Sequence, residues 1–174
     1  MKNFYPEKPV VPYFNAKVEM SAIIEGLKSL DYTAEVKRTA YVIIRNETGN
    51  GKSVVCGTNI AGVQSDSGKW DEKYDDLISA TCVKAENKTG KERGFVVFNT
   101  LDDGISFLLD KVQNRGLYIG GHVTKITDMQ IADKNDLATA YLRTWVTGVS
   151  NYTPKQVEIS NFTSMYNQAE KLFV

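Results

Sequence analysis

The chain contains few of the residues that build metal centres and thiol-based sites. It has one histidine and two cysteines in 174 residues, and no Cys-x-x-Cys pair. The histidine, His122, is far in sequence from Cys56 and Cys82, so the spacing of a zinc site is absent. We therefore expect no metal and no cofactor. The cysteines are expected to be two buried thiols or one disulfide, with the thiols favoured.

An excess of charge of one sign and a long apolar run are also missing. Lys plus Arg and Asp plus Glu each number 21, and no basic stripe with interleaved aromatics occurs, so we expect no nucleic-acid partner. No apolar run approaches the roughly 18 residues of a spanning helix, so we expect no membrane insertion. The proline-containing N-terminus lacks the apolar core of a secretory signal peptide, which predicts a protein made in the cytoplasm.

The composition present is that of a globular protein. Hydrophobic residues make up 42% and charged residues 24%, close to the averages for folded domains. We expect residues 1–16 to form an extended arm and residues 17–174 to form a single domain. The oligomeric state is not predicted.

Apolar periodicity predicts helices towards both ends of the chain. A helix over residues 100–116 is expected to begin with a capping box formed by Thr100 and Asp103. The other expected helices cover residues 17–30, 33–47, 135–146 and 159–173.

The middle of the chain, residues 49–98, has short β-favouring runs separated by turns that contain glycine, serine and asparagine. Residues 85–98 predict a β-hairpin with its turn at Asn87 to Gly90. The expected fold class is therefore α+β, mainly helical, with a small β-hairpin lobe after the second helix.

Glu47 lies where the second expected helix meets the glycine-containing loop "TGNG". Two interpretations fit this position. Glu47 is either a solvated acid at an ordinary helix end or a general acid whose pKa is raised by the apolar run "YVII" and by the negative end of the helix dipole. The local pattern alone favours the first.

Four segments in order change that balance: "NETGNGK", "TNIAGVQSDSGKW", the hairpin "TCVKAENKTGKERGFVVF" and "NTLDDGISFLLDKVQNRGLYIGG". Their order and spacing resemble the peptidoglycan-cleaving glucosaminidases of glycoside hydrolase family 73 and flagellar type, members of the lysozyme-like superfamily. The resemblance covers roughly residues 33–121, about half of the chain. It implies a lysozyme-like catalytic domain.

By position, the resemblance implies that Glu47 is the general acid that protonates the leaving glycosidic oxygen. Asn59 and Gly62 of "NIAG" would line the cleft floor. The second carboxylate is Glu86 by position, with Asp66 as the competing candidate. Glu86 fits a hairpin surface charge equally well, and the separation that chemistry needs cannot be read from a sequence.

Three aromatic residues are candidates for contacts with a sugar. Tyr152 of "SNYTPKQ" is nearest to the family's tyrosine segment, but it departs from that pattern because Asn151 precedes it and no acid precedes Pro154. Tyr118 is a second option, although core packing suits it better. Trp70 is either a sugar-stacking platform or the anchor of a turn.

The expected function is a hydrolase that cleaves the glycan strand of peptidoglycan, of N-acetylglucosaminidase or muramidase type, with peptidoglycan glycan strands as its partner. The alternative is a non-catalytic lysozyme-like protein that binds glycan or builds a virion. Without an export signal, a phage endolysin or virion-associated lysin that acts at the bacterial cell wall is the expected context.

Overall fold

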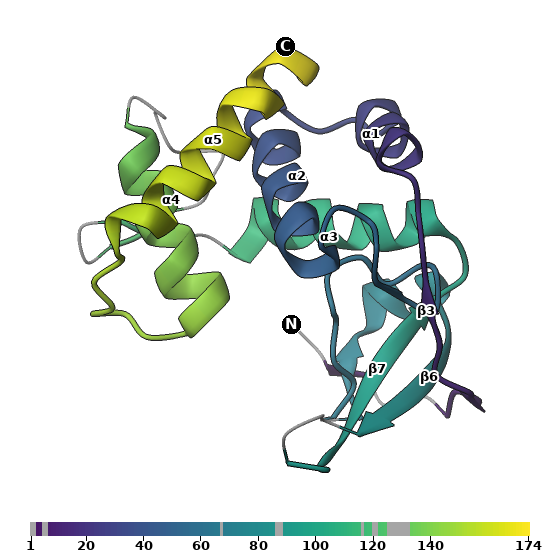
Figure 1. The fold of residues 1–174 in the computed structure, drawn as a ribbon. Coiled ribbons are helices and arrows are strands. Elements are labelled where there is room, and N and C mark those ends of the chain that lie inside the picture. Colours follow the sequence, from purple (N-terminus) through teal and green to yellow (C-terminus); the bar gives the residue numbers. More distant parts are fainter. Residues whose placement is uncertain are drawn as a thin grey trace. The chain divides into compact units, whose positions relative to one another are not determined.

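The computed structural model describes residues 3–4, 7–66, 68–85, 89–115, 117–119, 122–124 and 133–174. The chain divides into two compact units. Unit 1 comprises residues 1–30 and 43–108, and unit 2 comprises residues 31–42 and 109–174. More of the described residues lie in helices than in strands (Figure 1), which confirms the α+β class that the sequence predicts.

The helices lie close to their predicted positions. The described helices are α1 (Met20–Ser29), α2 (Ala34–Thr48), α3 (Leu101–Arg115), α4 (Lys134–Tyr141), the π-helical turn η3 (Leu142–Thr147) and α5 (Gln156–Leu172). The helix predicted over residues 135–146 is thus α4 continued by η3, and it ends at Gly148, whose φ of 66° is left-handed. Such a residue commonly terminates a helix.

The capping box at the start of α3 is confirmed. The Thr100 backbone N–H donates to Asp103 Oδ2 at 3.1 Å, and the Asp103 N–H donates to Thr100 Oγ1 at 3.1 Å. These two bonds satisfy N–H groups that have no partner within the helix. They fix the point at which the chain leaves the hairpin and enters α3.

A β-hairpin is the centre of unit 1. Strands β6 (Ile78–Ala85) and β7 (Glu92–Phe98) are antiparallel, with Ile78 opposite Phe98 and Ala85 opposite Glu92, and they run side by side in Figure 1. This confirms the predicted pairing, while Asn87 of the predicted turn lies outside the described residues. The hairpin is preceded by the 3₁₀ turn η1 (Glu72–Leu77).

The N-terminal residues that are described are extended, as expected for an arm. They supply β1 (Asn3–Phe4), β2 (Val10–Val11) and β3 (Asn15–Ala16). These pair respectively with β5 (Trp70–Asp71), with β6 and with β4 (Val54–Val55). In unit 2, β8 (Leu117–Ile119) pairs with β9 (His122–Thr124). The division into an arm and one domain stays a prediction.

Both faces of the hairpin are apolar. Alternate residues of a strand point to opposite faces, so Val96 and Phe98 join one buried cluster and Val97 joins another. The first cluster comprises Tyr74, Ile78, Val96, Phe98 and Phe107, and the second comprises Cys56, Ala80, Cys82 and Val97. The hairpin is therefore held from two sides, which gives a fixed frame for the loop that connects α2 to β6.

Candidate active site

Glu47 is the next-to-last residue of α2. The helix stops here because Gly49, Asn50 and Gly51 all have positive φ, at 58°, 62° and 78°, and this conformation cannot continue a right-handed helix. The side chain of Thr48 closes the turn: its Oγ1 donates to Ile44 O at 2.6 Å and accepts from Gly51 N–H at 2.8 Å. Glu47 is therefore exposed beside a turn that is firmly fixed.

Gly62, in the loop that follows α2, lies close to the Glu47 carboxylate. A Cβ built on Gly62 would lie 3.5 Å from Glu47 Oε2, and Gly62 itself has a φ of 59°. Glycine adopts this conformation without steric cost and leaves open the space that a side chain would fill. The structure thus brings Glu47 and Gly62 together.

Protein atoms around Glu47 displace water from its carboxylate. This desolvation raises the pKa of Glu47 above the ordinary glutamic acid value, because it disfavours the charged form. The side chain nevertheless remains exposed to an approaching molecule. A carboxylic acid that stays protonated to higher pH and can still be reached has the two properties that a general acid needs.

Asn59 has a different place from the one expected. It is 1% exposed, and its Nδ2 donates to Val96 O at 2.8 Å and to Val63 O at 3.0 Å, while its Oδ1 accepts from Val63 N–H at 2.9 Å. Because the Asn59 amide is buried and is hydrogen-bonded to backbone groups, it is not available to contact a substrate. Asn59 instead fixes the loop that carries Gly62 to strand β7.

Asp66 lies at the other end of the same loop segment. Its Oδ1 accepts from Gly94 N–H at 2.5 Å, and its Oδ2 accepts from Arg93 Nη1 at 3.0 Å. The Gly94 N–H and the Arg93 guanidinium lower the pKa of Asp66. Its carboxylate is therefore an ionised group that is held in place, in contrast to that of Glu47.

The segment from Gly62 to Asp66 runs along β7. It begins beside the Glu47 carboxylate and ends at Asp66. Val96 N–H donates to Val63 O at 3.0 Å, and Ser65 N–H donates to Gly94 O at 2.8 Å. Between them, Gln64 and Phe95 form an isolated antiparallel β-bridge. The five residues of this segment make four steps of extended chain, which span at most ~14 Å. A single polymeric substrate is long enough to contact both ends.

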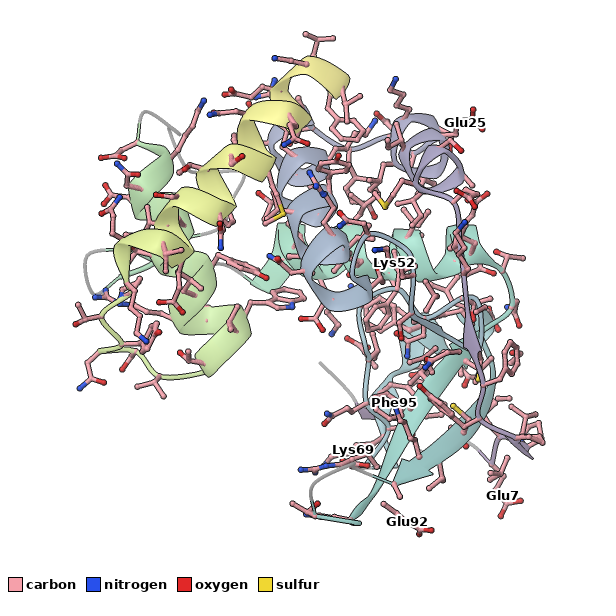
Figure 2. The ribbon with its side chains drawn as sticks, in the orientation of Figure 1. Glu7, Glu25, Lys52, Lys69, Glu92 and Phe95 are labelled. Carbon is pink, nitrogen blue, oxygen red and sulfur yellow. The ribbon has the colours of Figure 1, made fainter. Side chains whose placement is uncertain are left out.

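Asp66 and Trp70 lie together in a depression of about 610 Å³, a volume within the usual range for ligand sites. Glu7, Lys8 and Glu92 also line it, and Figure 2 shows Glu92 near the hairpin end of β7. The Trp70 Nε1 donates to Asp75 Oδ1 at 3.2 Å, and its ring packs against the buried cluster around Phe98. Trp70 therefore anchors its turn and also presents a surface to the depression.

Of the remaining sequence candidates, Tyr152 is the one whose side chain the structure describes. Glu86 lies outside the described residues, and so does the side chain of Tyr118. Tyr152 belongs to unit 2, where its hydroxyl donates to the Glu158 carboxylate at 2.8 Å. Since Glu158 also accepts from Lys155 N–H at 2.7 Å at the start of α5, Tyr152 takes part in the cap of that helix.

Thr48, Lys8 and Asp75 are not among the residues that the sequence pattern indicates. The position of Thr48 directly before "GNG" was a usable signal, because a threonine hydroxyl can accept from the backbone of a turn. Lys8 Nζ pairs with Asp75 Oδ1 at 3.1 Å, and no local pattern could reveal this pairing because the two residues are distant in sequence.

Replacing Gly62 with Ala is expected to lower the rate of the glycan cleavage that the sequence predicts. The effect on this rate should be larger than the effect on the free energy of unfolding. The backbone cost of a positive φ is about 1–2 kcal/mol, and the new methyl group would also occupy the space beside Glu47 Oε2. Gly148→Ala is the matched control, because Gly148 has a φ of 66° and an added Cβ there has no neighbour within 4 Å. Urea unfolding should give similar losses for both variants, and equal activity of the two would contradict the placement of the site.

Among the described residues, no group of three or more His, Cys, Asp or Glu side chains is arranged to hold a metal ion. None of the helices that the structure describes is both long and apolar enough to cross a membrane. Comparison with known protein families, with curated proteins and with solved structures found no match to this chain.

Proposed function

We propose that the protein is a glycosidase that cleaves the glycan strand of peptidoglycan, with Glu47 as its general acid. The observation that carries this proposal is the Glu47 carboxyl group, exposed at the end of α2 beside Gly62 and with a raised pKa. The ordered motifs around Glu47 that resemble those of the lysozyme-like glucosaminidases supply the substrate class.

In the proposed reaction, protonated Glu47 donates to the glycosidic oxygen as the bond to the sugar carbon breaks. The sugar passes through an oxocarbenium-like transition state. Ionised Glu47, formed by this donation, then lies next to positive charge, which stabilises it in a partly desolvated site. Gly62 leaves space for the sugar at the carboxyl group.

The charge of Asp66 fits the role of the second carboxylate. A nucleophile or a general base must be ionised, and the lowered pKa of Asp66 keeps it so. Its bonds to Gly94 and Arg93 leave acceptor capacity, since a carboxylate has about four lone-pair positions. Direct attack requires the two carboxyl groups to be near 5 Å apart, and a water-mediated mechanism requires roughly 6.5–9.5 Å. The extended segment between Gly62 and Asp66 spans up to ~14 Å, so this role requires the Asp66 carboxylate to lie closer to Glu47 than the full length of the segment. Glu86 stays the alternative for this role.

Binding of an extended glycan follows from the same arrangement. The segment from Gly62 to Asp66 leads from Glu47 to the depression that Trp70 lines. An indole face pairs well with the apolar face of a sugar ring. We propose that successive sugars lie along this segment, with one of them against Trp70.

The activity is expected to fall as pH rises through the raised pKa of Glu47. Only the protonated acid can donate, and desolvation keeps Glu47 protonated to higher pH than an ordinary glutamic acid. The rate of release of reducing sugar from purified peptidoglycan, measured against pH, should therefore show an alkaline limb above the ordinary glutamic acid pKa. A rate that is constant across that range, at pH values where the protein stays folded, would contradict this assignment.

A non-catalytic role in glycan binding is the second candidate, and it is favoured by the hydrogen bonds that tie Asp66 to β7. On this account the Trp70 depression binds glycan and no bond is cleaved. Incubation of the wild-type protein with insoluble peptidoglycan separates the two candidates. Co-sedimentation without release of reducing sugar would support binding alone, whereas release of reducing sugar supports the glycosidase.

The cellular context is proposed on the sequence alone. We propose a lysin that acts at the bacterial wall, where peptidoglycan lies, and that is encoded by a phage or carried on its virion. Lysis of host cells from within, which requires a partner that opens the membrane, would distinguish this context from wall remodelling.

A further inference from the structure

Cys56 and Cys82 bring their sulfur atoms into contact inside unit 1. The two Sγ atoms are 3.4 Å apart, and both residues are free thiols in the structure. Cys56 follows β4, and Cys82 lies in the middle of β6. The two residues are 7% and 0% exposed respectively.

The backbone at Cys56 is firmly held. Its N–H donates to Phe14 O at 2.9 Å, and its Sγ lies 3.9 Å from Pro12 O. Its φ of 50° is left-handed, which is uncommon for a residue with a side chain. The turn therefore directs the Cys56 thiol at Cys82, and the S–S separation of 3.4 Å needs to shorten by about 1.4 Å to reach that of a disulfide.

The surroundings of the two thiols are apolar. Ala80 and Val97 complete the buried cluster, and Val11, Tyr13, Val55 and Phe95 pack against it. A disulfide is also apolar and has nearly the volume of two thiols in contact, so the same cluster can enclose either form. When the sulfurs join, a covalent bond replaces the weak thiol contact between Cys56 and Cys82, and the weak thiol contact to Pro12 O is lost.

We propose that Cys56 and Cys82 form a site of reversible oxidation, in which a small peroxide converts the two thiols into one intramolecular disulfide. The Cys56 sulfur first attacks one oxygen of hydrogen peroxide, the O–O bond breaks, and a sulfenic acid and one water form. The Cys82 sulfur then attacks the Cys56 sulfur and expels the hydroxyl group, which leaves as a second water with the Cys82 proton. Two electrons pass from the sulfurs to the peroxide.

We assign the first reaction to Cys56 because 7% of this residue is exposed, whereas none of Cys82 is. Cys82 is fully enclosed, and burial together with the contact to Cys56 raises the pKa of the Cys82 thiol to about 12. A thiol that stays protonated is a poor first nucleophile. Its role is to resolve the sulfenic acid 3.4 Å away.

The cross-link would close the loop of residues 56–82. This loop carries Gly62, Asp66 and Trp70, so oxidation would limit the motion of the candidate site relative to β6. Closing a loop of this length restricts the unfolded chain and is expected to raise the melting temperature by about 5–15 °C. The proposal rests on the sulfur geometry and holds whether or not the protein cleaves glycan.

The test uses the folded wild-type protein, treated with dilute hydrogen peroxide and then denatured in an alkylating reagent. Mass spectrometry is expected to show a monomer that has lost two hydrogens and takes up no alkyl group, with residues 56 and 82 joined in the digest. Its melting temperature should rise, and a reducing agent should reverse both changes. Two alkylated cysteines after treatment, over-oxidised sulfurs without a cross-link, or cross-linking only between molecules would each overturn the proposal.

Cys82→Ala provides the matched control. It keeps Cys56 and removes the resolving sulfur, so peroxide should leave a sulfenic acid at Cys56 that a dimedone label traps. Cys56→Ala should take no dimedone label and retain a thiol at Cys82. If wild-type Cys56 takes a lasting dimedone label and no disulfide forms, Cys82 does not attack the Cys56 sulfenic acid, which contradicts the proposal. A melting transition under reducing conditions establishes that each variant is folded. If a variant does not fold, the experiment on the wild-type protein still decides the proposal.

Discussion

Replacing Glu47 with Gln is expected to lower the rate of glycan cleavage by about 10²–10⁴-fold, the contribution that a positioned general acid makes. The amide keeps the shape of the side chain beside Gly62 but is far too weak an acid to protonate the leaving oxygen. The rate of reducing-sugar release from purified peptidoglycan measures the loss. Binding to insoluble peptidoglycan should be nearly unchanged, which separates a chemical defect from a binding defect.

The same substitution should leave stability at neutral pH unchanged or slightly higher. The pKa of Glu47 is raised in the folded state, so the folded protein binds more protons than the unfolded chain between the two pKa values. Stability therefore falls as pH rises through that interval, and Gln removes this dependence. Glu25→Gln is the matched control, because Glu25 is exposed on α1 (Figure 2). A Glu47→Gln variant as active as Glu25→Gln would refute the assigned role.

Replacing Asn59 with Ala is expected to reduce the free energy of unfolding by about 2–4 kcal/mol. The side chain makes three hydrogen bonds to the backbone of Val63 and Val96 while 1% exposed. Its loss leaves buried backbone groups without a side-chain partner, at a cost of about 1–3 kcal/mol each when they stay unsatisfied. Urea unfolding measures the change.

Asn161→Ala is the control for this experiment, since Asn161 is exposed on α5 and its substitution should change stability by less than about 0.5 kcal/mol. Asn59→Ala should also lower activity at temperatures where the variant is folded, because the loop that places Gly62 beside Glu47 loses its attachment to β7. Equal stability of the two variants would show that the Asn59 bonds contribute nothing to the loop.

Local signals account for what the sequence predicted correctly. The periodic apolar stripes located the helices to within a few residues, and Thr100 with Asp103 marked the start of α3 through bonds between near neighbours in sequence. The end of α2 at Thr48 follows from the glycines after it. Each of these features depends on residues within about one helical turn of each other.

Features that depend on distant residues were not predictable in the same way. Asn59 was expected at the cleft floor, but its partner Val96 comes from β7 and draws the amide into the interior. The contact between Cys56 and Cys82 needs the register of β6 beside the turn after β4, which neither cysteine specifies locally.

Asp66 shows how environment decides between two carboxylates that look alike in sequence. A backbone N–H and a guanidinium bind its oxygens and keep it ionised, whereas desolvation favours the protonated form of Glu47. This division matches the proposed roles of base or nucleophile and acid. Asp66→Asn and Glu86→Gln, assayed together, would assign the second carboxylate.

Mass spectrometry of the soluble products from purified peptidoglycan tests the central claim most directly. Cleavage of the glycan strand by the wild-type protein should release fragments with intact peptides and a new reducing-end amino sugar, whose identity separates glucosaminidase from muramidase, and Glu47→Gln should release almost none. Fragments in which the peptides are cut and the glycan is intact would contradict the account. The same holds if the folded wild-type protein releases no soluble fragments.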